Sequence, residues 1–156
     1  MGRAKERGHG ADMFLGEYQH TLDAKGRVSL PRKFRDATGG RLVVSKGFER
    51  SLAVYTVEGY EAFLAGLVSG GDMTRDVRAV RRHFTVGADE VEVDSAGRIS
   101  LKPQLREFAG LDRDVIVAGV GDHMEIWDAA AWAAYETEHA QTIEDAAEEL
   151  ARQGIL

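Results

Sequence analysis

One internal repeat limits the possible folds of this chain more than any other feature of the sequence. Residues 23–31 read DAKGRVSLP, and residues 94–101 read DSAGRISL, so the pattern returns 71 residues after its first copy. Equivalent positions continue beyond the motif, in the pairs Phe34 and Leu105, Arg35 and Arg106, Gly39 and Gly110, Tyr55 and Trp127, Tyr60 and Trp132, and Phe63 and Tyr135. The repeat predicts two copies of one supersecondary unit, related by a pseudo-twofold axis.

Each motif predicts a tight turn that leads into a strand and then a short helix. Gly26 and Gly97 supply the positive φ that such turns usually demand, which places Arg27 and Arg98 alike at the turn exits. Asp23 and Asp94 could in principle form a catalytic carboxylate pair. Their identical places before identical turns favour a structural role, in which each accepts turn N–H groups or pairs with its own arginine.

Apolar spacing and Gly/Pro punctuation predict the other elements. A strand at 14–22 is expected to form a hairpin with residues 27–30. The remaining strands are expected at 41–46, 52–56, 91–93, 115–118 and 124–127, and helices at 31–38, 60–67, 73–84, 103–109 and 129–139. For the arginines of the 73–84 helix, Arg75, Arg78, Arg81 and Arg82, a solvated basic face is favoured slightly over contact with DNA.

The last 17 residues have no counterpart in the first copy. Thr142 and Asp145 resemble a capping box, followed by a narrow apolar stripe of Ile143, Ala147 and Leu150. Such a stripe needs a partner surface, either the body of this chain or a neighbouring subunit. The expected organisation is a disordered basic leader (1–12), a first half (13–68), a linker with a basic helix (69–89), a second half (90–139) and an acidic C-terminal helix (140–156).

The composition limits the kinds of site that this chain can form. The chain has no cysteine, its five histidines do not fall at metal-ligand spacing, and no apolar run approaches a membrane span of about 20 residues. We therefore expect a soluble cytoplasmic protein, either one compact domain or two small fused halves, with no metal, cofactor or small-molecule substrate. A hydrolase using Asp23 or Asp94 would lack a base, nucleophile or metal partner.

Charge is unevenly distributed along the chain. The net charge is −6, but residues 1–50 hold 11 Lys/Arg against 6 Asp/Glu, a net of +5, and residues 51–156 hold 9 against 20, a net of −11. One part of the chain could therefore meet an anion. Because asparagine is absent, reading of bases would fall to Arg and Lys, whose favoured target is the O6/N7 edge of guanine.

The sequence MFLGEY at 13–18 leading to DAKGR, with RHF at 82–84 and GA at 87–88 before DSAGR, resembles the MraZ family of bacterial transcriptional regulators. The resemblance covers roughly Met13 to Tyr135. It implies an α+β fold: a β-rich, pseudo-twofold swapped-hairpin (AbrB-like) barrel with short flanking helices, here followed by the C-terminal helix, and assembly of chains into rings.

The same resemblance implies a nucleoid-associated repressor. Its partner would be double-stranded DNA with guanine-containing direct repeats, upstream of the division and cell-wall gene cluster that includes its own operon. Arg27 and Arg98 are the first candidates for DNA contact, and the other candidates are Lys25, Arg32, Lys33, Arg35, Lys102 and Arg106. Ala96 stands opposite Lys25, which predicts a weaker second half. The alternative is a non-enzymatic ring-forming protein whose Arg turns form subunit contacts.

Overall fold

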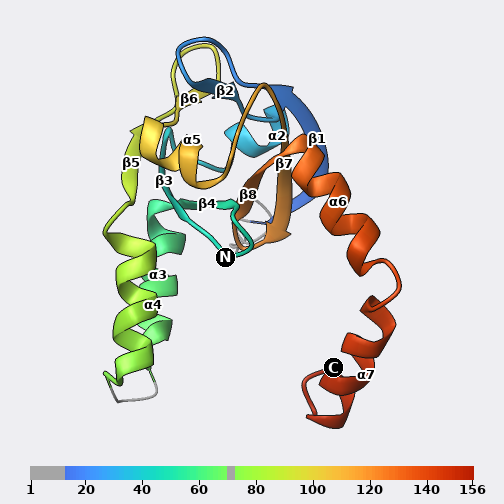
Figure 1. The fold of residues 1–156 in the computed structure, drawn as a ribbon. Helices are drawn as coiled ribbons and strands as arrows, with labels where there is room; N and C mark the ends of the chain where they lie inside the picture. Colours follow the sequence, from blue (N-terminus) through green and yellow to red (C-terminus); the bar gives the residue numbers. More distant parts are fainter. Residues whose placement is uncertain (1–12, 70–72) are drawn as a thin grey trace, which may run out of the picture.

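The computed structural model describes residues 13–69 and 73–156, and its class is α+β. A six-stranded antiparallel sheet forms the body, and a separate two-stranded sheet closes one end (Figure 1). The six strands, in spatial order, are β1 (Phe14–Thr21), β7 (Asp114–Gly121), β8 (Met124–Asp128), β4 (Leu52–Thr56), β3 (Arg41–Lys46) and β5 (Asp89–Glu92). The two-stranded sheet pairs β2 (Arg27–Ser29) with β6 (Arg98–Ser100).

The two repeat copies complete each other through β2 and β6. Val28 faces Ile99 at the centre of this antiparallel pair. The ladder continues outward, because the Leu30 N–H donates to the Gly97 carbonyl (2.9 Å) and the Leu101 N–H donates to the Gly26 carbonyl (2.8 Å). Each copy therefore lends a strand to the other, which is the AbrB-like swapped-hairpin arrangement, and the register is what a pseudo-twofold axis through Val28 and Ile99 requires.

The predicted hairpin between residues 14–22 and 27–30 is wrong. The eight residues of β1 pair instead with the eight residues of β7, from Phe14 opposite Gly121 to Thr21 opposite Asp114. Only the bridge between Leu22 and Val28 joins the first strand to β2. β2 has three residues, whereas β7 offers a ladder as long as β1, so pairing across the two halves satisfies more backbone groups.

One hydrophobic core is shared by the two halves. Its fully buried members include Val28 and Leu30 from the first motif and Ile99 from the second, and they pack with Leu42, Leu52, Met124 and Ile126 of the large sheet. Because the buried residues of both motifs belong to one hydrophobic cluster and neither motif has a core of its own, the two halves form one folding unit.

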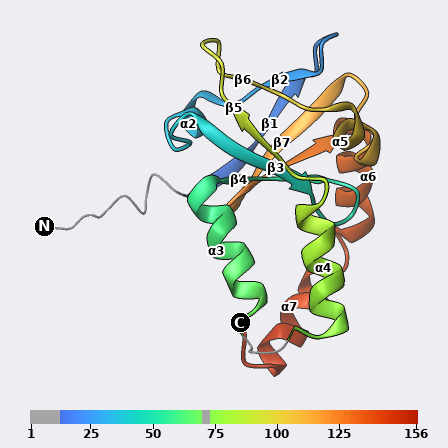
Figure 2. The ribbon, with the colours of Figure 1, turned by 90° about the vertical axis from the view of Figure 1, so that its left-hand side faces the viewer.

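The helices extend to either side of the sheet (Figures 1 and 2). Short α2 (Arg32–Arg35) and α5 (Pro103–Phe108) follow the two motifs, as expected. On one side α3 (Val57–Leu67) and α4 (Arg75–Thr85) form a pair, joined by the Tyr60 hydroxyl donating to the Phe84 carbonyl at 2.7 Å. On the other side α6 (Ala129–His139) lies against β7 and β8, and α7 (Ile143–Arg152) continues away from the body.

The start of α7 differs from the prediction. Thr142 is the N-cap residue, but its side chain accepts no hydrogen bond from the helix. Its hydroxyl instead donates to the His139 carbonyl at 3.1 Å, at the end of α6. The capping box is therefore absent, because the backbone of Thr142 (φ −106°, ψ −6°) is helical, whereas an N-cap residue accepts from the helix in an extended conformation. The predicted leader and most of the predicted break at 69–72 lie outside the described residues.

Candidate nucleic-acid interface

The two motif turns have the same hydrogen bonds. One carboxylate oxygen of Asp23 accepts from the Lys25 N–H (2.9 Å) and the Arg27 N–H (2.8 Å), and the other accepts from Arg27 Nε (2.8 Å). Asp94 accepts equivalent bonds from the Ala96 N–H (2.9 Å), the Arg98 N–H (2.9 Å) and Arg98 Nε (3.0 Å). Both structural roles considered for these aspartates therefore occur together.

These bonds also lower the pKa of both aspartate carboxyls. The largest cause is the backbone N–H of Arg27 for Asp23 and of Arg98 for Asp94, with further contributions from the arginine side chains. A carboxyl with a lowered pKa is ionised at neutral pH and is a poor proton donor. The geometry thus assigns the two aspartates to turn formation and to orientation of the arginines.

Gly26 and Gly97 occupy the left-handed conformation, with φ of 78° and 80°. They also allow a close approach between the halves. A Cβ on Gly26 would lie 2.9 Å from Arg106 Cζ, and a Cβ on Gly97 would overlap the Arg35 guanidinium more severely. Each turn glycine therefore leaves space for an arginine of the opposite half, in addition to forming its own turn.

Arg35 and Arg106 are half-buried at this contact. Arg35 Nε donates to the Leu30 carbonyl at 2.9 Å, and Arg106 Nε donates to the Leu101 carbonyl at 3.0 Å. Each arginine thus fixes the short helix of its own half to the preceding strand while its guanidinium lies against the turn of the other half. The structure gives these two members of the predicted DNA-binding set a role in joining the halves.

Arg27 and Arg98 share the outer face of the two-stranded sheet with two serines. Alternation along a strand puts Arg27 and Ser29 opposite the buried Val28, and puts Arg98 and Ser100 opposite the buried Ile99. Arg27 faces Ser100 and Arg98 faces Ser29, so the arginines occupy diagonal positions about 7 Å apart along the strands. Figure 2 shows the two turn loops at this end of the molecule, separated from each other.

The guanidinium groups of Arg27 and Arg98 are held in place by hydrogen bonds but remain partly exposed. The Arg27 and Arg98 side chains keep 29% and 33% of their surface exposed. In each, Nε is used by the aspartate, and within residues 13–69 and 73–156 neither of the two terminal nitrogens has a hydrogen-bond partner. A guanidinium has five N–H donors in a planar fork, so the remaining edge can bind an acceptor.

Further cations surround the outer face. Lys25, Arg32 and Lys33 are exposed in the first half, and Lys102 is half-exposed in the second. Residues 22–38 hold five Lys/Arg against two Asp/Glu, a net of +3, whereas the equivalent residues 93–109 hold three against two, a net of +1. The first half therefore presents the stronger positive field, and Ala96 in place of Lys25 contributes to the difference.

Two parts of this geometry escaped the sequence reasoning. Ser29 and Ser100 are not part of the predicted site, although strict alternation from Arg27 and Arg98 places them on the same face. The second part is the contact between opposite copies, of Arg35 with Gly97 and of Arg106 with Gly26. The only sequence signal for this contact is that the two arginines hold equivalent positions in the repeat.

In the described part of the chain, no group of three or more His, Cys, Asp or Glu side chains is arranged to hold a metal ion. No helix of residues 13–69 or 73–156 has the length and apolar character needed to cross a membrane.

The fold and the site define a class of protein: a two-copy swapped-hairpin protein that presents paired arginines and a cationic surround at one end. The family model described as "MraZ protein, putative antitoxin-like" matches residues 13–83 and again residues 84–153. The chain belongs to the MraZ family. The second match runs past Tyr135 and takes in the acidic C-terminal helix, which the motif resemblance alone did not cover.

Curated relatives agree over most of the chain. A protein of Acetivibrio thermocellus named "Transcriptional regulator MraZ" is 44% identical over 143 residues, which is 92% of this chain and all of the relative. The protein of the same name from Syntrophomonas wolfei is 42% identical over the same shares of the two chains. The one from Mycobacterium avium is 42% identical over 137 residues, 88% of this chain and 96% of the relative.

Proposed function

We propose that this protein is a sequence-specific DNA-binding transcriptional regulator. The single observation that carries the proposal is the display of Arg27 and Arg98 on one face, each held by its own aspartate with the outer edge of its guanidinium directed to no partner in the described residues. The names of the relatives support the same conclusion. They belong to a transcription regulator class and not to an enzyme class.

The proposed division of labour follows the chemistry of the side chains. Arg27 and Arg98 read bases, because a planar guanidinium matches the O6/N7 edge of guanine with two hydrogen bonds. Lys25, Arg32, Lys33 and Lys102 contact phosphates, which gives affinity and orientation but little sequence preference. Arg35 and Arg106 act indirectly, by holding the two turns in position. The net charges of the halves predict the stronger contact from the first.

The small size of one such face leads to proposals for the operator and for the assembly of chains. Two arginines can specify few bases, so we propose that chains self-associate into a ring whose neighbouring faces engage successive guanine-containing direct repeats. Each further contact becomes effectively intramolecular, which raises avidity by about 10²–10⁴. The targets proposed, from family resemblance, are the division and cell-wall genes and the protein's own operon, with repression as the outcome at the nucleoid.

The test compares Arg27→Ala, Arg27→Lys and Arg98→Ala on the protein's own upstream DNA and on a scrambled duplex. Arg27→Ala should abolish specific binding, and Arg98→Ala should reduce it less. Arg27→Lys is the matched control: it keeps the charge but loses the fork, so binding to scrambled DNA should persist while the preference for upstream DNA falls. Duplexes with one, two or three repeats then test the avidity.

Two results would count against the proposal. A folded Arg27→Ala variant that binds upstream DNA as tightly as the parent would remove Arg27 from the interface. Binding that does not weaken with salt would exclude phosphate contact as the source of affinity and favour the alternative, in which the Arg turns are subunit contacts.

A further inference from the structure

Two helices at opposite sides of the molecule carry opposite charge and have exposed polar faces. α4 holds four arginines against one aspartate, a net of +3, and α7 holds four Asp/Glu against one arginine, a net of −3. They are also nearly equal in length, at 11 and 10 residues, or about 16 Å and 15 Å. Figure 1 shows them on separate arms, α4 beside α3 and α7 beyond α6.

The basic face of α4 points away from the body. Phe84 is buried and Val80 is half-buried against Tyr55 and Phe63, so this stripe of the helix is used within the chain. Arg78 and Arg82 lie one turn apart, outside that stripe, and both are exposed. Within the described residues no arginine of α4 forms an ion pair, and the one side-chain hydrogen bond of Arg78 goes to the Met73 carbonyl at 2.8 Å.

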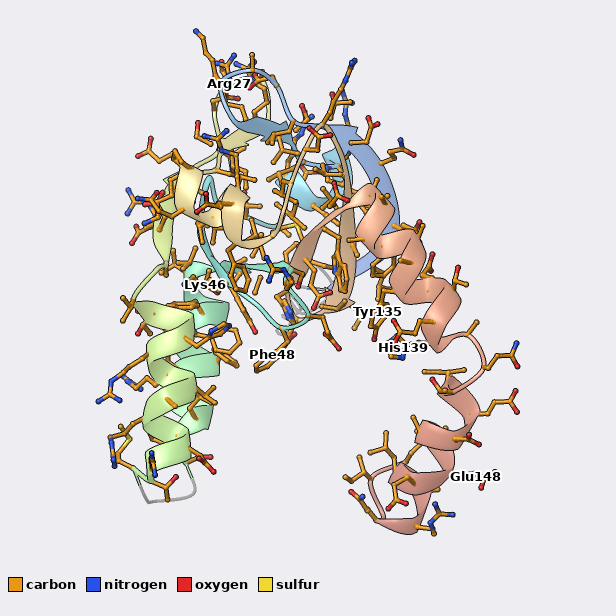
Figure 3. All side chains as sticks on the ribbon, viewed as in Figure 1. Arg27, Lys46, Phe48, Tyr135, His139 and Glu148 are labelled. Atoms are coloured by element: carbon orange, nitrogen blue, oxygen red, sulfur yellow. The ribbon has the colours of Figure 1, made fainter. Side chains whose placement is uncertain are left out.

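The acidic face of α7 is equally open. Glu144 and Glu148 are also one turn apart, and Figure 3 shows Glu148 directed outward, away from the α3–α4 arm. Arg152 offsets part of the charge, through contacts with Glu149 (2.8 Å) and Glu148 (3.8 Å). α7 has no buried residue, and Ile143 and Leu150 are 67% and 39% exposed, so nothing in the described part of its own chain covers it.

We infer that α7 of one chain docks along α4 of a second copy, with Glu144 and Glu148 meeting Arg78 and Arg82. Within one chain the two helices lie on separate arms, so their exposed faces can meet only between chains. Such a head-to-tail contact uses two different surfaces and leaves one of each free at every step. It therefore generates a closed ring or an open filament, depending on the rotation between neighbours. The inference rests on the proposed self-association and names the surfaces that carry it.

Charge reversal with rescue tests this contact. Arg78→Glu with Arg82→Glu reverses the basic face, and Glu144→Lys with Glu148→Lys reverses the acidic face. Each variant should raise the protein concentration needed for half-assembly by about tenfold or more, because facing like charges cost several kcal/mol and 1.4 kcal/mol is tenfold. The chain carrying all four changes should recover assembly. The control Arg32→Glu with Lys33→Glu makes the same change in charge on α2 and should assemble normally.

Light scattering and sedimentation of DNA-free protein, with circular dichroism as the folding check, distinguish the outcomes. A parent chain that is monomeric would refute the proposed self-association itself. An assembled parent with folded, normally assembling variants would overturn this inference alone, as would a fourfold variant that stays dissociated. If the α4 variant assembled normally but lost affinity for scrambled DNA, its arginines would belong to a second DNA-contacting surface.

Discussion

Gly97→Ala is the sharpest probe of the contact between the halves. An L-residue at the φ of 80° found here costs about 1–2 kcal/mol in backbone strain. The new methyl group would also overlap the Arg35 guanidinium, which must then move and give up the hydrogen bond from its Nε to the Leu30 carbonyl. A hydrogen bond that involves a charged group contributes about 1.5–3 kcal/mol, so we expect a total loss of about 2.5–5 kcal/mol.

Gly110→Ala supplies the matched control. Gly110 also has a positive φ, 61°, but a Cβ there meets no atom within 4 Å. This variant should therefore show the strain alone, about 1–2 kcal/mol. The difference between the two variants, about 1.5–3 kcal/mol, then measures the close approach of Arg35.

Urea unfolding at one fixed protein concentration is the suitable assay. With an m-value of about 2 kcal/mol/M, the midpoint for Gly97→Ala should lie about 1 M below that for Gly110→Ala. In an Arg35→Ala background, Gly97→Ala should cost only the strain, about 1–2 kcal/mol, because the hydrogen bond from Arg35 is already absent there. Equal midpoints for the two glycine variants would refute the idea that Gly97 is needed for the approach of Arg35.

Two further predictions concern single contacts. Tyr60→Phe should destabilise the protein by about 1 kcal/mol and lower Tm by about 2–4 °C, because the hydrogen bond from the Tyr60 hydroxyl to the Phe84 carbonyl joins α3 to α4. Tyr135→Phe is the control, since within the described residues the Tyr135 hydroxyl has no hydrogen bond. An equal loss of stability in both variants would contradict this reason. The lowered pKa values of Asp23 and Asp94 mean that their stabilising effect is complete above the ordinary aspartate pKa of about 3.9 and is lost as pH falls through the lower folded values. Carbon NMR titration of the two carboxyl groups should give midpoints below about 3.9, and a midpoint at or above that value would rule out the turn hydrogen bonds as their main influence.

Most elements could be predicted from the sequence because their signals are local. Gly26 and Gly97 fix two turns, Pro103 begins a helix, and the apolar run at Val115 marks a buried strand. The face of β2 could also have been worked out by alternation. These features depend on neighbours a few residues away, which a single sequence displays directly.

Strand pairing could not be predicted in the same way. The residues of β1 do not themselves show whether this strand folds back on residues 27–30 or pairs with β7. The choice depends on the length of the available ladder and on a strand that begins 93 residues after Thr21, at Asp114.

The same non-local pairing explains why the candidate site needs both copies of the motif. β2 pairs along its whole length only with β6, and an arginine of the opposite half lies against each turn glycine. A single copy would leave the Val28 strand without its ladder and Arg35 without the surface against which it lies. Two copies in one chain instead fix the spacing between Arg27 and Arg98 through a shared core. The DNA-contacting face proposed here is therefore a property of the pair, and differences such as Lys25 against Ala96 can alter the strength of one turn without altering its position.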